Sequence, residues 1–394
     1  MLFLLLSQFL SALADNAILI LAIAVLKAER QAEVIPFLQA GFIAPFILLA
    51  PLAGPLADSM PKAKMLVRAN TLKLFGAILM ATGLNTIAAY GLIGIGATLY
   101  SPAKYGILSQ MFSPAQLVKA NGLLEGSTIV AILLGVVLGG WLSDHSLVMA
   151  FRAIMGAYAL ASVMAFRIPV LPPERIDPER SPIRALQRFS TDLKIMMSHP
   201  DIRFSLLGTS LFWASGTTLR LLLFAWVPIS LGITDNSTPA NLMGLVSTGI
   251  VAGAFAAGWL ISLASVNRAL PGSLLLGPVL LLLSQTHHLW QAALLMILTG
   301  LCGGYFVVPL NALLQEKGHE TRGAGHALAI QNFVENIAMM LFVGLYSVAR
   351  TQNISPESAL RIFAILLIIA TLGLTVHRLK KSTPQGTRKH DGHT

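Results

Sequence analysis

Charged residues are scarce in this chain: Asp, Glu, Lys and Arg make up only 11% of its 394 residues, whereas a soluble domain carries about 25%. Hydrophobic residues make up 55%, and the mean hydropathy is +0.73. This composition assigns the chain to the membrane proteins. Cysteine is almost absent as well. Because Cys302 stands alone, no intrachain disulfide can form, and redox chemistry is not expected.

Long apolar runs, in contrast, are abundant. Runs of about 20 residues, broken regularly by Gly, Pro and charge, are typical of membrane-spanning helices. The first run continues to Leu26 with no Lys or Arg before it, so we expect a spanning helix and not a cleaved signal peptide. The sequence thus predicts an all-α membrane protein with twelve transmembrane helices, over residues 3–26, 35–57, 65–86, 90–112, 117–141, 147–168, 202–231, 240–264, 268–286, 290–315, 323–349 and 357–379.

The only long hydrophilic stretch lies between the sixth and seventh predicted helices. It begins with a proline-rich P-E-R repeat, and its second half could form an amphipathic helix on the membrane surface. An offset of 204–207 residues brings Gly54 onto Gly258 and Pro102 onto Pro309, which indicates two related halves. We therefore expect an N-terminal six-helix bundle (1–168), a cytoplasmic, partly helical linker (169–201), a C-terminal six-helix bundle (202–380) and a basic cytoplasmic tail (381–394).

Positive charge is distributed unevenly along the chain. A formal net charge of +10 would fit a nucleic-acid-binding protein, but the Lys and Arg residues gather in alternate loops, as topology signals and contacts with anionic lipid do. The linker, the loop around Lys62 and the C-terminal tail hold most of them. The positive-inside rule therefore predicts that both termini and the linker are cytoplasmic, with no role in nucleic-acid binding.

Several polar side chains fall inside the predicted spans, although a carboxylate at the bilayer centre costs roughly 2.5 to 3.5 kcal/mol. Many are spaced four apart, as Asn121 and Glu125 are, and so share one helix face. A water-filled cavity between the halves would explain them together; hydrogen bonds between packed helices are the alternative. The set comprises Asp15, Asn16, Lys73, Lys104, Tyr105, Asn121, Glu125, Arg220, Asn311, Gln315, Gln331, Asn332, Glu335 and Asn336.

A cavity with both signs of charge suits particular cargoes. A guanidinium group binds phosphate through paired hydrogen bonds, while carboxylates bind an ammonium group or a coupling Na⁺ or H⁺. A zwitterionic or anionic phosphate head group would be held at both ends. On these grounds alone, sugars, drugs and amino acids remain open as cargoes.

The segment "GPLADSMPKAK" contains Gly54, Asp58, Lys62 and Lys64. A glycine, an aspartate four residues later and basic residues in the following loop resemble the signature of the major facilitator superfamily. The resemblance implies that these residues form a conformational switch, in which the aspartate makes contacts that break and reform as the halves rock. The match departs from the signature at Pro61, and the second half has Ser262 in place of the acid.

Further segments resemble one subfamily, the bacterial lysophospholipid transporters: "QFLSALADNAILI", "YSPAKYGIL", "LVKANGLLEGSTIVAILLG", "FSLLGTSLFWASGTTLRLLLFAWVPISLGITDN", "FVVPLNALLQEKG" and "GAGHALAIQNFVENIAM". The resemblance implies a protein of the bacterial inner membrane that moves lysophosphatidylethanolamine and related lipids from the outer to the cytoplasmic leaflet. A companion acyl-carrier-protein synthetase/acyltransferase would then re-acylate them.

On this resemblance, Arg220 with Lys104 would hold the phosphate, and Asp15 and Glu125 would hold the ammonium group or a coupling ion. The full substrate-binding set would be Asp15, Asn16, Lys104, Tyr105, Glu125, Arg220, Asn311, Gln315, Asn332 and Glu335. No cofactor or metal is expected beyond a coupling Na⁺ or H⁺, for which Asp15 is the candidate. We expect a monomer that contacts its lipid substrate and the surrounding membrane lipid.

Two other functions are compatible with the sequence to different degrees. A proton-coupled exporter of drugs or other amphiphiles on the same fold is the main alternative. A membrane-embedded enzyme would need a His or Cys beside an acid, but His145, His287 and His288 fall at predicted external ends without a partner motif. We therefore expect a transporter and not an enzyme.

Overall fold

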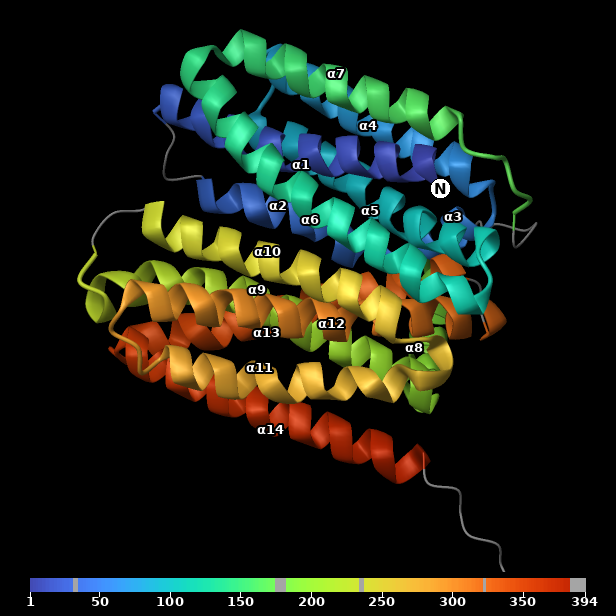
Figure 1. The fold of residues 1–394 in the computed structure, drawn as a ribbon. Helices are drawn as coiled ribbons and strands as arrows, with labels where there is room; N and C mark the ends of the chain where they lie inside the picture. Colours follow the sequence, from blue (N-terminus) through green and yellow to red (C-terminus); the bar gives the residue numbers. More distant parts are fainter. Residues whose placement is uncertain (31–34, 174–181, 234–236, 322–323, 383–394) are drawn as a thin grey trace, which may run out of the picture.

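The structure, a computed structural model, describes residues 1–30, 35–173, 182–233, 237–321 and 324–382. Within these ranges it is helical and has no strand. The long helices run side by side in two groups, one blue to green and one yellow to red (Figure 1). The first group comprises α1 (Leu2–Ala28), α2 (Ile35–Leu48), α3 (Ala50–Asp58), α4 (Lys62–Ala81), α5 (Thr86–Met111), α6 (Pro114–His145) and α7 (Leu147–Phe166). The second comprises α9 (Pro200–Ser230), α10 (Ser237–Leu260), η2 (Leu263–Ala269), α11 (Leu270–Leu283), α12 (Leu289–Thr321), α13 (Ala324–Thr351) and α14 (Pro356–Ser382).

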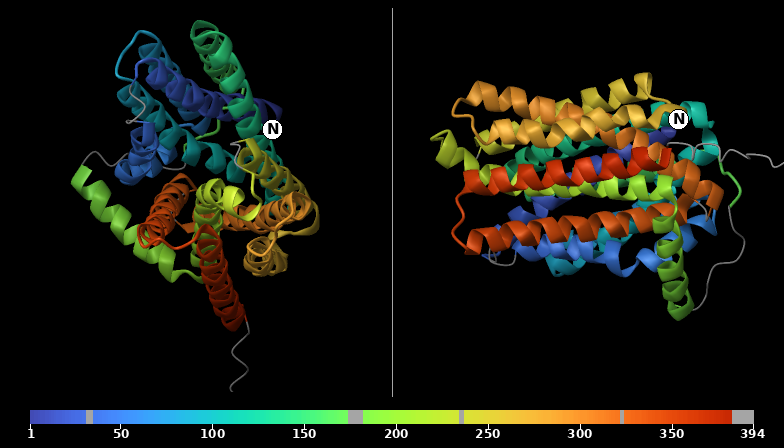
Figure 2. Two further views of the ribbon diagram at one scale, coloured as in Figure 1. Left: turned by 90° about the vertical axis from the view of Figure 1, so that its left-hand side faces the viewer. Right: turned by 90° about the horizontal axis from the view of Figure 1, so that it is seen from below.

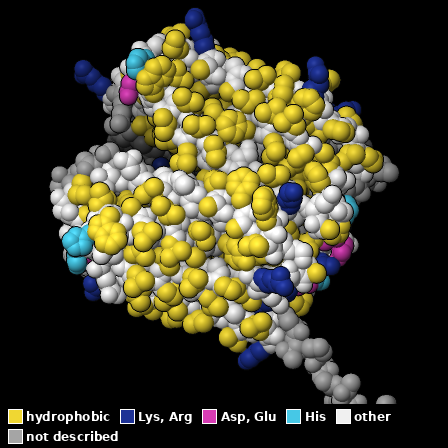
Figure 3. Space-filling model, in the orientation of Figure 1, with side chains coloured by type: hydrophobic (Ala, Val, Ile, Leu, Met, Phe, Trp, Pro, Cys, Tyr) yellow, Lys and Arg dark blue, Asp and Glu magenta, His cyan; other side chains and the backbone are white. Residues whose placement is uncertain are grey.

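The all-α membrane fold expected from hydropathy is confirmed. Among the described residues, nine helices are long and apolar enough to cross a membrane, and ten if the bent pair α2–α3 is one span. The remaining two long helices, α4 and α5, are not in that set. Hydrophobic side chains cover much of the visible face of the bundle, and Lys and Arg side chains are sparse on it (Figure 3).

The helix pair α2–α3 is bent by 66°. The break falls just before Pro51, which is at the N-terminus of α3. A proline there has no N–H to continue the hydrogen bonding of the preceding helix. The predicted span 35–57 is therefore two helical segments, and the second one carries Gly54 and Asp58.

Helix α8 (Pro182–Ser198) lies in the second half of the predicted linker. It is roughly at right angles to the bundle helices and at the same end as the N-terminus (Figure 2, right). We call this the linker end. The P-E-R repeat of the linker and the tail from residue 383 lie outside the described residues.

Among the described residues, the two groups of helices share an apolar core at the linker end. One core there joins residues of both groups, for example Leu66 and Leu124 with Ala254 and Leu310. Away from that end the cores are separate: one is built from α1, α2, α4, α5 and α7, and another from α9 to α14. The described halves are thus packed together at the linker end and independently built at the other.

Helices α10 and α12 pack with their backbones in close contact at glycine residues. A Cβ added at Gly249 would lie 2.1 Å from the Ile297 carbonyl oxygen, and one at Gly300 would lie 1.9 Å from the Val246 carbonyl oxygen. In lipid, where no hydrophobic force drives helices together, such small-residue contacts permit tight van der Waals packing. The two helices therefore form a fixed pair inside the C-terminal half.

We expect Gly249→Ala to destabilise the protein by about 1 to 3 kcal/mol, the usual effect of overpacking. The new methyl group would overlap the α12 backbone, which cannot move aside as a side chain can. Thermal unfolding of the detergent-solubilised protein, followed by intrinsic fluorescence, measures the effect. The matched control is Gly244→Ala on the same helix, where a Cβ meets nothing within 4 Å. Equal unfolding midpoints for the two variants would contradict this account of the helix pair.

Candidate functional site

The signature segment lies where α3 of the first half crosses α13 of the second. Gly54 makes the crossing possible, because a Cβ there would lie 2.7 Å from the His326 Cα. The Asp58 carboxylate accepts hydrogen bonds from the backbone N–H groups of Gly325 (2.9 Å) and His326 (3.0 Å). Asp58 therefore caps the N-terminus of α13, where unpaired N–H groups and the helix dipole favour an anion.

The two lysines of the signature have different surroundings. Lys62 is buried, and its Nζ lies 3.3 Å from Asp58 Oδ1. Lys64 is exposed. Lys62 thus belongs to the junction between the halves, together with Gly54 and Asp58, whereas Lys64 lies on the surface beside it.

Glu125 on α6 anchors a chain of hydrogen bonds that crosses from one half to the other. It accepts a hydrogen bond from the Tyr105 hydroxyl on α5 and another from Asn311 Nδ2 on α12 (3.2 Å). Gln331 on α13 donates both to Asn311 Oδ1 (2.8 Å) and to Glu335 Oε1 (2.7 Å). This network brings together four predicted site residues from four helices: Tyr105, Glu125, Asn311 and Glu335.

Two pairs of polar side chains close the seam on either side of this network. Asn121 and Gln315 exchange two hydrogen bonds, of 3.0 and 2.7 Å, between α6 and α12. Asn332 donates to Ser101 Oγ across the α5–α13 contact at 3.0 Å. Gln315 and Asn332 therefore hold the halves together in this conformation.

Lys104 on α5 is a cation beside this network, since it contacts the ring of Tyr105. Its side chain is buried, and its Nζ lies 4.0 Å from the centroid of the Tyr105 ring. The carboxylates of Glu125 and Glu335 are near enough to attract its positive charge. Among the described residues, no carboxylate lies within 4 Å of the Lys104 ammonium group. A buried ammonium group without a close anion is suited to bind one from outside the protein.

Asp15 is not part of this network. Its carboxylate accepts hydrogen bonds from Lys73 Nζ (2.7 Å) and from the Tyr158 hydroxyl (2.8 Å), and Lys73 also reaches Ser11 (3.0 Å). All these partners belong to the N-terminal half. The structure thus pairs Asp15 locally and does not bring it to Arg220, as the single shared cavity expected from the sequence would require.

Arg220 and Asn16 also lie outside the network. Arg220 on α9 is exposed, and no hydrogen bond or ion pair joins it to another described residue. Asn16 donates to the carbonyl oxygen of Ala12 on its own helix (2.8 Å). Of the ten predicted substrate residues, four therefore form the network between the halves, Gln315 and Asn332 form the flanking pairs, Lys104 lies beside them, and three lie elsewhere.

Three further polar residues of the Asp15 cluster were not among the predicted site residues. Lys73 stood out as a charge inside a span, but Ser11 and Tyr158 are common in membrane helices and gave no signal. Only the packing of distant helices brings them to Asp15.

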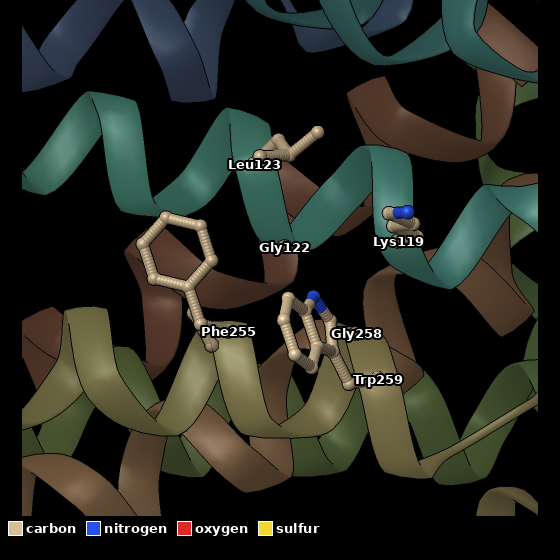
Figure 4. Close-up of a pocket in the computed structure, with 7 residues that line it drawn as sticks. Lys119, Gly122, Leu123, Phe255, Gly258 and Trp259 are labelled. Atoms are coloured by element: carbon tan, nitrogen blue, oxygen red, sulfur yellow. The ribbon is translucent and has the colours of Figure 1, made fainter.

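A small recess opens between α6 and α10, on the flank where the halves meet. Lys119, Gly122 and Leu123 of α6 face Phe255, Gly258 and Trp259 of α10 across it (Figure 4). A Cβ at Gly122 would lie 2.8 Å from the Ala254 carbonyl oxygen, so the helices almost touch here. The recess is apolar and belongs to the helix crossing, not to the polar network.

These features define the class of protein. Two groups of long helices, a signature segment at their junction and a polar seam are those of a secondary transporter. In agreement, residues 4–343 match the model of the Major Facilitator Superfamily, and the chain belongs to this family.

Within the superfamily, the chain is similar to the lysophospholipid transporter LplT of Escherichia coli (strain K12 / DH10B) and of Shigella boydii serotype 4 (strain Sb227). Each is 48% identical over 344 residues, which is 87% of this chain and of the relative. The fold resembles that of the E. coli fucose:proton symporter FucP (TM-score 0.75, 16% identity, covering 95% and 97% of the two chains) and of the human organic anion transporter MFSD10 (TM-score 0.73, 16% identity, 94% and 99%).

We expect Lys73→Met to cost roughly 3 kcal/mol of stability, at the low end of the range for breaking a buried ion pair. Asp15 would lose its cation while its carboxylate stays mostly buried, because its side chain is only 19% exposed. Denaturant unfolding in mixed micelles measures the loss. The double variant Asp15→Asn, Lys73→Met leaves no unpaired charge and should recover part of it. A double variant no more stable than Lys73→Met would show that the ion pair is not the cause.

Proposed function

We propose that this protein transports lysophospholipids, lysophosphatidylethanolamine among them, from the outer to the cytoplasmic leaflet of the bacterial inner membrane. The observation that carries the proposal is the 48% identity to curated lysophospholipid transporters over 87% of the chain. A companion acyl-carrier-protein synthetase/acyltransferase would restore the missing acyl chain. The protein would work as a monomer with both termini and α8 in the cytoplasm.

The phosphate of the head group would bind to Lys104. Among the described residues this buried ammonium group has no carboxylate within 4 Å, and a charge-assisted hydrogen bond to phosphate would give it an anionic partner. Arg220, exposed on α9 of the opposite half, would add its guanidinium group when the cargo enters. Cations from the two halves would then act on one anion.

The ethanolamine ammonium group would bind at the carboxylate end of the network. Glu125 and Glu335 are buried, and Tyr105, Asn311 and Gln331, which donate hydrogen bonds to them, are neutral. Two buried carboxylates beside one lysine favour a further cation. A zwitterionic head group would thus neutralise both ends of the site.

Alternating access would follow from breaking the seam at the linker end. Asp58 would release the α13 N-terminus, and the Asn121–Gln315 and Ser101–Asn332 pairs would exchange their hydrogen bonds for water. A coupling Na⁺ or H⁺ would act at Asp15, where it has to compete with the Lys73 ammonium group at 2.7 Å. Neutralising Asp15 would free Lys73 and loosen the packing of the N-terminal half.

The test supplies labelled lysophosphatidylethanolamine to spheroplasts that contain this protein and the acyltransferase, and follows its conversion to diacyl lipid. We expect Asp15→Ala, Arg220→Ala and Lys104→Gln each to insert normally and to lower the initial rate roughly tenfold or more, since each removes a charged hydrogen bond worth about 1.5 to 3 kcal/mol.

The matched control is Lys119→Gln, which removes a lysine exposed at the linker end and should convert lipid at the wild-type rate. Normal conversion by the three site variants would remove the site assignment. A protein that converts no lysophospholipid but exports amphiphilic dyes in a proton-dependent way would overturn the proposed function.

A further inference from the structure

The linker helix α8 touches both halves of the protein. It packs against α3 of the N-terminal half and against α9 and α13 of the C-terminal half. It lies across the linker end, outside the two groups of long helices (Figure 2). A helix in this place is connected to both bodies that have to move apart when the linker end opens.

One face of α8 is buried against the two halves of the protein. Ala185, Phe189, Asp192 and Met196 recur at three- and four-residue spacing, and all four are buried. Phe189 and Met196 belong to an apolar cluster that also contains Ala50 and residues of α9, α12 and α13, and the Phe189 ring lies edge-on to Phe333 at 5.3 Å. Docking of α8 is therefore specific and not a loose association with the membrane surface.

The buried face includes one carboxylate. Asp192 Oδ2 lies 2.8 Å from His326 Nε2, and the two side chains are 2% and 1% exposed. His326 is in the first turn of α13, and its backbone N–H is bound by Asp58 from α3. Two carboxylates from two different elements thus hold the same residue, Asp58 through the backbone and Asp192 through the imidazole.

This arrangement has a mechanical consequence. Opening the linker end separates α3 from α13, and α8 is then unable to keep its contacts with both. If α8 stays with α3, the 2.8 Å contact between Asp192 and His326, two almost fully buried side chains, is lost, and breaking a buried ionisable pair is costly. The Asp192–His326 contact therefore favours the conformation in which the linker end is closed.

We propose that α8 is a latch: its Asp192–His326 contact stabilises the closed linker end, and α8 has to undock before that end can open. This device supplements the Asp58 cap and is carried by the linker, which belongs to neither six-helix bundle. The inference depends on the fold and not on the identity of the cargo.

Distance measurements between spin labels test the latch in the full chain. Labels are placed at Arg167→Cys and Glu320→Cys, which are exposed at the linker ends of α7 and α12, in a Cys302→Ser background that removes the single native thiol. In lipid nanodiscs we expect Asp192→Ala to raise the ratio of long to short distances roughly fivefold or more. The matched control, Lys194→Gln on the exposed side of α8, should leave the distribution unchanged.

His326→Ala and the double variant Asp192→Ala, His326→Ala complete a double-mutant cycle. Because the double variant removes both side chains of the contact, it also covers the case in which Asp192→Ala folds poorly. We expect it to shift the distances no further than either single variant. An unchanged distribution in the double variant, or effects of the two substitutions that simply add, would overturn the latch.

Discussion

The interior of a bilayer offers no water to hydrogen-bond a polar group, so every polar side chain of an inner helix needs a partner in the protein or in a hydrated cavity. In this protein that constraint places the polar side chains along the seam between the halves. Glu125, Asn311 and Gln331 satisfy one another there, and Asn121 does the same with Gln315. Unlike the apolar core that the halves share at the linker end, these groups can exchange their partners for water.

The two kinds of contact in the molecule therefore have different functions. Within the C-terminal half, α10 and α12 meet backbone to backbone, and such a contact has one good geometry. Between the halves, beside the apolar core that they share at the linker end, lie the Asp58 cap and pairs of amide side chains, which can be broken one at a time. Rigid bodies joined by a breakable polar seam are what a rocking mechanism requires.

Hydropathy predicted the helices well, because span length and composition are local properties: the predicted and observed ends differ by at most six residues. Helical spacing also predicted the polar faces, and Tyr105, Glu125, Asn311 and Glu335 do form one network. The positions of Asp15 and Arg220 could not be predicted in this way. Asp15 binds Lys73, 58 residues away, and such a pairing depends on the rotation of each helix against its neighbours. The burial of Asp192 has the same cause: a charged residue in a hydrophilic linker is expected to be solvent-exposed, and only packing against α13 brings it to His326.

The contact of α10 with α12 also limits how a lipid tail could travel. Because even one methyl group added at Gly300 would lie 1.9 Å from the Val246 carbonyl oxygen, no alkyl chain fits between the two helices at this point. A cargo whose head group enters the seam while its hydrocarbon tail trails into the membrane must therefore pass through a different gap. The C-terminal half is closed along this line, whereas the gaps between the halves widen when the halves separate, and there a trailing tail could remain in the membrane.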